Sequence, residues 1–169
     1  MTHLPQHRSA HPFSVYRRRR VLLTSALLAA LLLVFGCAAP QVRLDLHATP
    51  HLNPSDEGQA LPVVVRVYQL KDPRGFEESP FEDLWKQDLT ILGADALSRQ
   101  ELVMQPGIRR DLTWQRHPGA THLGVMAVFR DPTTPDWRDI RSLPGGRLGR
   151  QMDQRLSVSL HGNRIVIED

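Results

Sequence analysis

Short stretches of alternating apolar and polar residues, bounded by proline or glycine, constrain the fold of this 169-residue chain more than any other feature. Gln41 to Ala48 alternates strictly, and Val63 to Leu70 (VVVRVYQL) consists largely of β-branched and aromatic residues. A period of two places successive side chains on opposite faces of a strand, so both stretches predict strands that bury one face. Leu123 to Phe129 is apolar on both faces, which indicates a buried strand.

Two hairpins and a helix follow from the remaining patterns. Glu101 to Met104 and Arg110 to Gln115 flank a Pro-Gly turn and predict one hairpin, and the segments on either side of Gly162-Asn163 predict another with a two-residue connection. Ser79 is followed directly by Pro80, and Glu82 lies three residues after the serine, an order typical of a helix start. Seven or eight short strands with one short inserted helix predict an all-β, two-sheet β-sandwich.

The N-terminal 36 residues have a different character. The apolar run Val21 to Phe35 follows four arginines, Arg17 to Arg20, and ends just before Cys37, the only cysteine of the chain. A basic start, an apolar stretch and small residues at its end are typical of a secretory signal peptide. A membrane-spanning helix needs about 20 apolar residues, and this run is shorter. We therefore predict a signal peptide over residues 1–36 and one domain over residues 37–169.

The end of the leader predicts a lipid anchor. Gly36 directly precedes Cys37, and together with Val34 and Phe35 it resembles the lipobox of bacterial lipoproteins. The resemblance implies that the Cys37 sulfur receives a diacylglyceryl group, that the chain is cut before Cys37, and that the new amine is acylated. Two acyl chains already give stable anchoring. Because Ala38 is not the aspartate that retains many lipoproteins at the inner membrane, we expect the periplasmic face of an outer membrane. No cofactor besides this covalent lipid is expected.

Removal of the leader reverses the charge balance. All 18 acidic residues follow Cys37 whereas five of the 21 basic ones precede it, so the mature chain carries 16 basic against 18 acidic residues. No basic stripe remains, which argues against nucleic-acid binding. Since no second cysteine follows, the domain has no disulfide, no thiol nucleophile and no thiolate metal site.

The usual signatures of catalysis are missing from the sequence. His47 and His51 are four residues apart but lie outside the predicted helix, and two histidines do not complete a zinc shell. The glycine-rich stretch Gly145 to Gly149 lacks the preceding strand and the Lys-Ser/Thr pair of a phosphate-binding loop. Three aspartates between positions 131 and 139 could gather around a cation, although a solvated loop is the simpler interpretation. We predict no catalytic residue, no metal site and no small-molecule substrate, and hence no enzyme.

Trp137 and Arg138 leave two interpretations open. Tryptophan and arginine are enriched at binding hot spots, so the pair could recognise a partner. Alternatively, the tryptophan fills the open end of the sandwich and the arginine lies at its rim, since tryptophan is usually largely buried.

Several stretches together indicate a family. Leu52-Asn53-Pro54 is followed by Gly58, Pro62 and the strand from Val63, and Phe129-Arg130-Asp131 comes later in the chain. This order resembles the outer-membrane lipoprotein of type VI secretion systems, the TssJ (VasD, SciN) family. The resemblance implies a transthyretin-like β-sandwich with an added helix. It also implies binding to the periplasmic domain of TssM, which works with TssL in a membrane core complex.

The loop from Thr49 to Pro62 needs an explanation of its own, because long loops in compact domains are usually functional. The resemblance places the family's contact with TssM in this loop, with Leu52 as an apolar anchor and Asp56 and Glu57 as charged groups. The predicted partner-binding residues are Leu52, Asn53, Pro54, Asp56, Glu57 and Gly58. An alternative hypothesis is an exported lipoprotein that binds cell-wall glycan through exposed aromatic residues or acts as an envelope chaperone.

Overall fold

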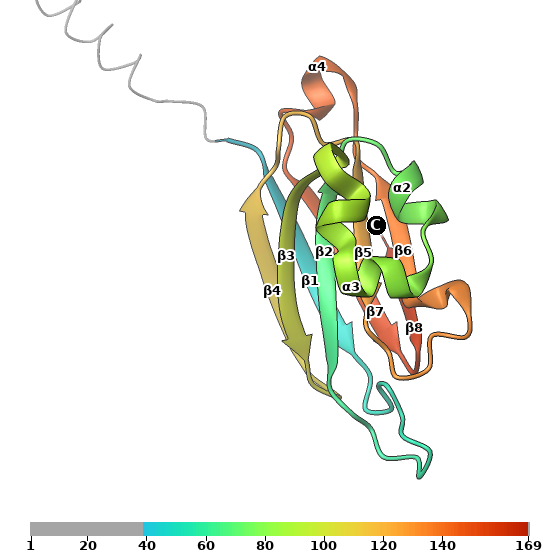
Figure 1. The fold of residues 1–169 in the computed structure, drawn as a ribbon. Helices are drawn as coiled ribbons and strands as arrows, with labels where there is room; N and C mark the ends of the chain where they lie inside the picture. The colour runs from blue at the N-terminus through green and yellow to red at the C-terminus, as the bar shows by residue number, and fades with distance from the viewer. Residues whose placement is uncertain (1–38, 169) are drawn as a thin grey trace, which may run out of the picture. The chain divides into compact units, whose positions relative to one another are not determined.

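Two four-stranded sheets make up the computed structural model, which describes residues 39–168 (Figure 1). The first sheet has the order β4-β1-β7-β8 and contains β1 (Gln41–Ala48), β4 (Arg109–Gln115), β7 (Gln154–His161) and β8 (Arg164–Glu168). The second has the order β3-β2-β5-β6 and contains β2 (Val63–Leu70), β3 (Ala96–Met104), β5 (His122–Ala127) and β6 (Arg138–Ser142). The predicted two-sheet β-sandwich is confirmed.

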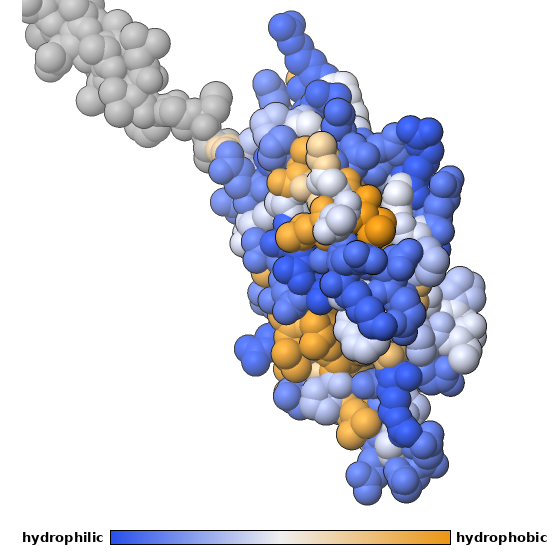
Figure 2. All heavy atoms as spheres, in the orientation of Figure 1, coloured by the Kyte–Doolittle hydropathy of each residue, from blue (hydrophilic) through white to orange (hydrophobic). Residues whose placement is uncertain are grey.

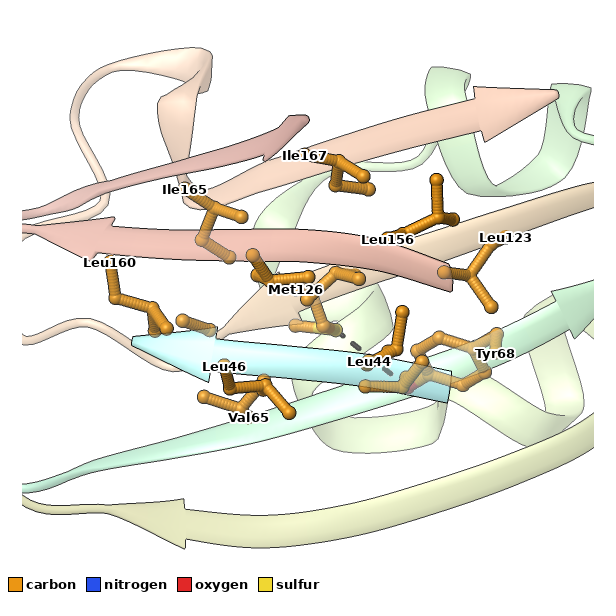
Figure 3. Close-up of a cluster of buried hydrophobic side chains, with 14 of the residues drawn as sticks. Leu44, Leu46, Val65, Tyr68, Leu123, Met126, Leu156, Leu160, Ile165 and Ile167 are labelled. Atoms are coloured by element: carbon orange, nitrogen blue, oxygen red, sulfur yellow. Dashed lines mark hydrogen bonds between the residues drawn. The ribbon is translucent and has the colours of Figure 1, made fainter. Parts of the chain in front are cut away.

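The core lies between the facing sheets, and the alternation of the sequence produces it. In β1, Val42, Leu44 and Leu46 are buried whereas Arg43 between them is exposed. Figure 3 shows side chains of both sheets meeting in this cluster, among them Val65 of β2 and Leu160 of β7. Each fully buried side chain of this size contributes roughly 1.5–3 kcal/mol relative to an exposed one, so the sandwich needs no cross-link.

The hairpin predicted across the Pro-Gly turn is wrong. Strand β3 pairs with β2 in the second sheet, whereas β4 pairs with β1 in the first, so the turn carries the chain from one sheet to the other. The turn is held by the end of β1, because Ala48 N–H donates to the Ile108 carbonyl (3.0 Å) and Gly107 N–H donates to the Thr49 carbonyl (3.1 Å). The hairpin predicted around Gly162-Asn163 is confirmed, since His161 pairs directly with Arg164.

Two helices, α2 (Arg74–Glu78) and α3 (Phe81–Leu92), cover the outer face of the second sheet (Figure 1). Helix α3 begins two residues after the predicted cap, and the Ser79 hydroxyl donates to the Gly75 carbonyl of α2 (2.5 Å) instead of capping α3. The shorter helical segments are the 3₁₀ turns Gly93–Asp95 and Pro135–Trp137 and helix α4 (Gly146–Gly149).

Gly124 lets α2 pack closely on the sheet. A Cβ at this position of β5 would lie 3.0 Å from Phe76 Cε1 and 3.1 Å from Leu70 Cδ1. Phe76 is fully buried, and its ring centroid lies 5.5 Å from that of Tyr68 on β2. A glycine within a strand is therefore explained here by the close approach of another element.

Candidate functional site

The loop Thr49–Pro62 extends from the end of the sandwich at which β1 finishes, at the lower edge of Figure 1. Its base belongs to the folded domain: Thr49 N–H donates to the Leu160 carbonyl (2.9 Å), and Leu61 N–H donates to the Leu52 carbonyl (3.0 Å). Leu52 has none of its surface exposed and is part of the core. Its side chain therefore supports the loop and offers no apolar surface to a partner.

Asn53 fixes the base of the loop to two other parts of the sandwich. Its backbone has φ 46°, in the left-handed region that asparagine tolerates better than most residues. Its side chain donates to the Pro62 carbonyl (2.9 Å) and accepts from Arg130 N–H (2.8 Å), and its own N–H donates to the Gly162 carbonyl (2.9 Å). Only 5% of Asn53 is exposed. This residue, too, holds the loop in place.

The tip of the loop is exposed and folded on itself. Pro54, Asp56, Glu57 and Gly58 are exposed, and Ser55 closes the turn by donating its N–H to the Gln59 carbonyl (2.8 Å). The Ser55 hydroxyl donates to the Glu57 carboxylate (2.9 Å) and accepts from Gln59 N–H (3.2 Å). This hydrogen bond from Ser55 lowers the pKa of Glu57 below its ordinary value, so Glu57 is ionised at neutral pH.

An ion pair orients the tip relative to the sandwich. The Arg130 side chain, which follows β5, forms it with the Asp56 carboxylate. Both groups are solvent-exposed, with 81% of the Asp56 side chain accessible, and exposed pairs contribute only about 0–1 kcal/mol. The pair therefore sets the direction of the tip more than the stability of the fold. The predicted loop residues thus divide into a buried base (Leu52, Asn53) and an exposed acidic tip (Pro54, Asp56, Glu57, Gly58).

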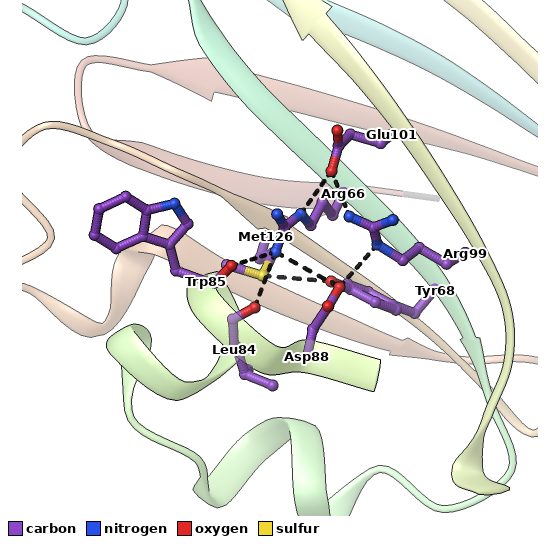
Figure 4. A network of polar contacts seen from close by, with 8 residues as sticks. All are labelled: Arg66, Tyr68, Leu84, Trp85, Asp88, Arg99, Glu101 and Met126. Atoms are coloured by element: carbon purple, nitrogen blue, oxygen red, sulfur yellow. Dashed lines mark hydrogen bonds and ion pairs between the residues drawn. The ribbon is translucent and has the colours of Figure 1, made fainter. Parts of the chain in front are cut away.

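A polar network between α3 and the second sheet was missed by sequence reasoning (Figure 4). Helix α3 is kinked at Gln87 (φ −147°, ψ 37°), and the Arg66 guanidinium of β2 donates to the carbonyls of Leu84 (3.0 Å) and Trp85 (2.8 Å) just before the kink. The same guanidinium donates to Glu101 (2.8 Å). Arg66 thus supplies hydrogen-bond donors to two carbonyls of the helical turn that precedes the kink.

The second half of this network is centred on Asp88 of α3, which is 8% exposed. Its carboxylate accepts from the Tyr68 hydroxyl (2.5 Å) and forms an ion pair with Arg99 (2.8 Å). Burial, followed by the hydrogen bond to Asp88, raises the pKa of Tyr68, which therefore stays protonated as a donor. These hydrogen bonds and ion pairs connect helix α3 to strands β2 and β3, so the role of the network is structural.

Trp137 and Arg138 also belong to the packing of the domain. Trp137 is 5% exposed and contacts the Phe81 ring edge-on, with centroids 5.1 Å apart. The Arg138 guanidinium lies 4.5 Å from the centre of the Trp137 ring and donates to the carbonyls of Phe76 and Ser79, both at 2.6 Å. Of the two interpretations left open by the sequence, these contacts favour the structural one.

A family model described as "Type VI secretion lipoprotein, VasD, EvfM, TssJ, VC_A0113" matches residues 40–163, which span nearly the whole sandwich. The chain belongs to this family of type VI secretion lipoproteins. No curated protein sequence matches it.

Solved structures agree with this assignment. The type VI lipoprotein TssJ1 from Pseudomonas aeruginosa is 31% identical over 77% of this chain and 95% of that chain, with a TM-score of 0.68. A chain of the structure described as the TssM C-terminal domain (869-1107) from EAEC is 27% identical, over 76% of this chain and 98% of that chain, with a TM-score of 0.65. A chain of a structure described as a type VI membrane complex is 28% identical, over 78% of this chain and 100% of that chain, with a TM-score of 0.68.

The predicted lipid anchor of this type VI secretion lipoprotein lies outside the described residues, because Cys37 and the predicted signal peptide precede Ala39. Within residues 39–168, no group of three or more histidine, cysteine, aspartate or glutamate side chains could hold a metal ion. Over the same range, no helix combines the length and the apolar character needed to cross a membrane.

Proposed function

We propose that this protein is an outer-membrane lipoprotein of the type VI secretion membrane core complex, that it anchors the complex by binding the periplasmic domain of TssM through the loop Thr49–Pro62, and that it is not an enzyme. TssL works with TssM in the same complex. The observation that carries the proposal is the loop itself, whose base is built into the core and whose acidic tip is exposed. Similarity to chains in structures described as a TssM C-terminal domain and a type VI membrane complex supports it.

The geometry of β1 suits a tether between two attachments. The strand begins at Gln41, four residues after Cys37, and ends at Ala48, where the loop begins. Eight residues of β-strand span about 26 Å, so the start of β1 and the proposed docking loop lie at opposite ends of the sandwich (Figure 1). The domain can be held at a membrane at one end and reach a partner with the other.

The surface at the loop end offers both charge and apolar area. The tip carries the carboxylates of Asp56 and Glu57, so a basic partner surface would be complementary. Ile108, beside the base of the loop, and Val103 near the end of β3 are 42% and 52% exposed. In an interface here, the two aliphatic side chains would form the apolar centre and the carboxylates of the tip would form the polar rim.

The test reverses the charge of the tip and leaves its base intact. We expect Asp56→Lys combined with Glu57→Lys to weaken binding to the purified TssM periplasmic domain at least tenfold in calorimetry, about 1.4 kcal/mol, without lowering the melting temperature. The matched control is Glu77→Lys with Glu78→Lys, an adjacent pair of exposed acids on α2, which should bind normally. Full binding by the doubly reversed tip would place the interface elsewhere.

The glycan-binding alternative needs exposed aromatic rings. Among the tryptophan, tyrosine and phenylalanine side chains of residues 39–168, only Trp85 is largely exposed, at 41%. Lys86 Nζ lies 5.4 Å from the centre of its ring. A single ring does not form a platform for a sugar chain, so we do not favour this function.

A further inference from the structure

The segment from Gly145 to Met152, here called the α4 segment, projects from the end of the sandwich opposite the loop, at the top of Figure 1. It carries the two most exposed large apolar side chains of the described residues, Leu148 at 80% and Met152 at 59%. Arg147 and Arg150 lie between and beside them and are also exposed. Apolar and basic side chains thus alternate along one small projection.

The α4 segment is fastened to the fold by a buried arginine. Arg116 is 2% exposed, and its guanidinium donates to the carbonyls of Pro144 (2.8 Å), Gly149 (2.9 Å) and Ala120 (3.3 Å). Burial, and next the nearby charge of Arg150, lowers the pKa of Arg116. Because these three partners are carbonyls, the positive charge is held in place without being neutralised by them.

The same segment is tied to the beginning of the folded chain. Arg116 N–H donates to the Pro40 carbonyl (2.8 Å), and the Asp153 carboxylate, directly after the segment, accepts from Gln41 N–H (2.9 Å) and from the Arg43 side chain (3.1 Å). Between the segment and the first described residues lies a hollow of about 620 Å³. It is lined by Ala39, Pro40, Arg116, Arg147 and Arg150 among others, with no acidic side chain in its lining.

We propose that the α4 segment docks on a membrane surface that contains anionic lipids. Leu148 and Met152 enter the boundary between head groups and acyl chains, and Arg147 and Arg150 pair with lipid phosphates, as interfacial amphipathic segments do. The inference rests on the proposed acylation of Cys37. Ala39 follows Cys37 by two residues, which span at most about 7 Å, so a lipid on Cys37 brings this end of the domain to the bilayer.

The test uses the mature acylated protein, which begins at Cys37, reconstituted on vesicles of phosphatidylcholine, alone or mixed with phosphatidylglycerol. Because Cys37 is the only cysteine and its sulfur is blocked by acylation, Leu148→Cys provides a single thiol for a fluorophore. We expect lipid-borne quenchers to quench a label at position 148 strongly on mixed vesicles and less on phosphatidylcholine alone. A label introduced by Gln59→Cys, at the loop tip, should not be quenched on either.

Charge reversal tests whether membrane docking depends on the arginines of the α4 segment or on basic residues anywhere on the surface. Arg147→Glu with Arg150→Glu should reduce the quenching at position 148 on mixed vesicles to the level found on phosphatidylcholine. The matched control is Arg109→Glu with Arg110→Glu, an exposed adjacent pair at the start of β4 near the loop end, which should leave the quenching unchanged.

Vesicle flotation separates this inference from the proposed anchor. If no variant floats with vesicles, the acyl anchor is wrong and the docking of the α4 segment falls with it. If every variant floats but position 148 is not quenched, the anchor stands and the docking is overturned. If the label at position 148 becomes shielded from solvent only when the TssM periplasmic domain is added, the membrane docking is overturned as well. The segment would then contact a protein.

Discussion

Ser55 and Asn53 show how single polar side chains give the loop Thr49–Pro62 a defined shape. At the base of the loop, the Asn53 side chain donates to the Pro62 carbonyl and accepts from Arg130 N–H. At the tip, the Ser55 hydroxyl donates to the Glu57 carboxylate and accepts from Gln59 N–H. Asparagine and serine are suited to this because short polar side chains reach nearby backbone groups. The tip is thus ordered by hydrogen bonds although it buries little apolar surface.

Replacing Ser55 should be visible in the titration of its neighbour. In Ser55→Ala the hydroxyl donor is lost, so the pKa of Glu57 should rise toward its ordinary value, as measured by NMR titration of the side-chain resonances. Because the folded pKa is the depressed one, the contact is present at neutral pH and is lost as the pH falls through that pKa. An unchanged Glu57 pKa in the variant would contradict the assigned hydrogen bond.

The sequence predicts a single set of partner-binding loop residues, and the structure divides this set into buried and exposed members. Leu52-Asn53-Pro54 stood out by resemblance, and Asp56 and Glu57 by charge. What makes Leu52 and Asn53 supporting residues is their contact with the core and with groups near positions 130 and 162, which are far away in sequence. Such contacts are set by tertiary packing, and no local pattern encodes them.

At the scale of elements, the kinked helix α3 depends on a side chain from the strand beneath it. Arg66 donates to two carbonyls at the kink and to Glu101 on β3, and it lies 3.5 Å from the Asp88 carboxylate. Only 14% of the Arg66 side chain is exposed, so solvent replaces few of these bonds if they are lost. The helix and the sheet are therefore joined by polar as well as apolar contacts.

Removing the Arg66 guanidinium should destabilise the domain by about 2–3 kcal/mol, because the part-buried Leu84 carbonyl loses this donor and the largely buried Asp88 carboxylate loses a nearby positive charge. Arg66→Met tests this by chemical denaturation, since methionine keeps much of the side-chain volume. Arg66→Lys should recover only part of the loss, because an ammonium group cannot donate in the fork geometry of a guanidinium. A methionine variant with the stability of the parent would show that the network is energetically neutral.

Pairing between elements was the least predictable level of the fold. The bounds of β1 and β2 follow from alternation, and the β7-β8 hairpin follows from its two-residue turn. The β3-β4 hairpin failed because alternation fixes which face of a strand is buried but not which sheet the strand joins. Helix α2 was missed because five residues carry too little periodicity, and its position depends on the space above Gly124.

At the scale of the whole molecule, the sandwich separates the end at which β1 begins from the end at which the loop projects (Figure 1). Figure 2 shows the face that carries α2 and α3 as mostly hydrophilic with separate apolar areas. The two sheets are also joined by a polar contact near the start of β1: fully buried Gln69 of β2 donates to the Gln115 carbonyl (2.9 Å) and accepts from His117 N–H (2.7 Å).

Removing the acylation site should change the location of the protein and leave its fold intact. In Cys37→Ser we expect the domain to be lost from the outer-membrane fraction and to keep its fold, as measured by the resistance of the domain to proteolysis, because the described sandwich begins after this position. The parent protein should fractionate with the outer membrane. A serine variant that still fractionates with the outer membrane would end the proposal of a lipid anchor at Cys37.

The central place of β1 has a mechanical consequence. The strand is bonded on both sides, from Gln41 opposite Gln115 to His47 opposite Arg109 in one ladder and from Val42 to Ala48 along β7 in the other. A pull between the proposed lipid anchor, which precedes β1, and the loop, which follows it, would run along the strand axis, whereas the hydrogen bonds to β4 lie across it. Both ladders would then resist the load together in shear, instead of opening one bond at a time like a peeled edge.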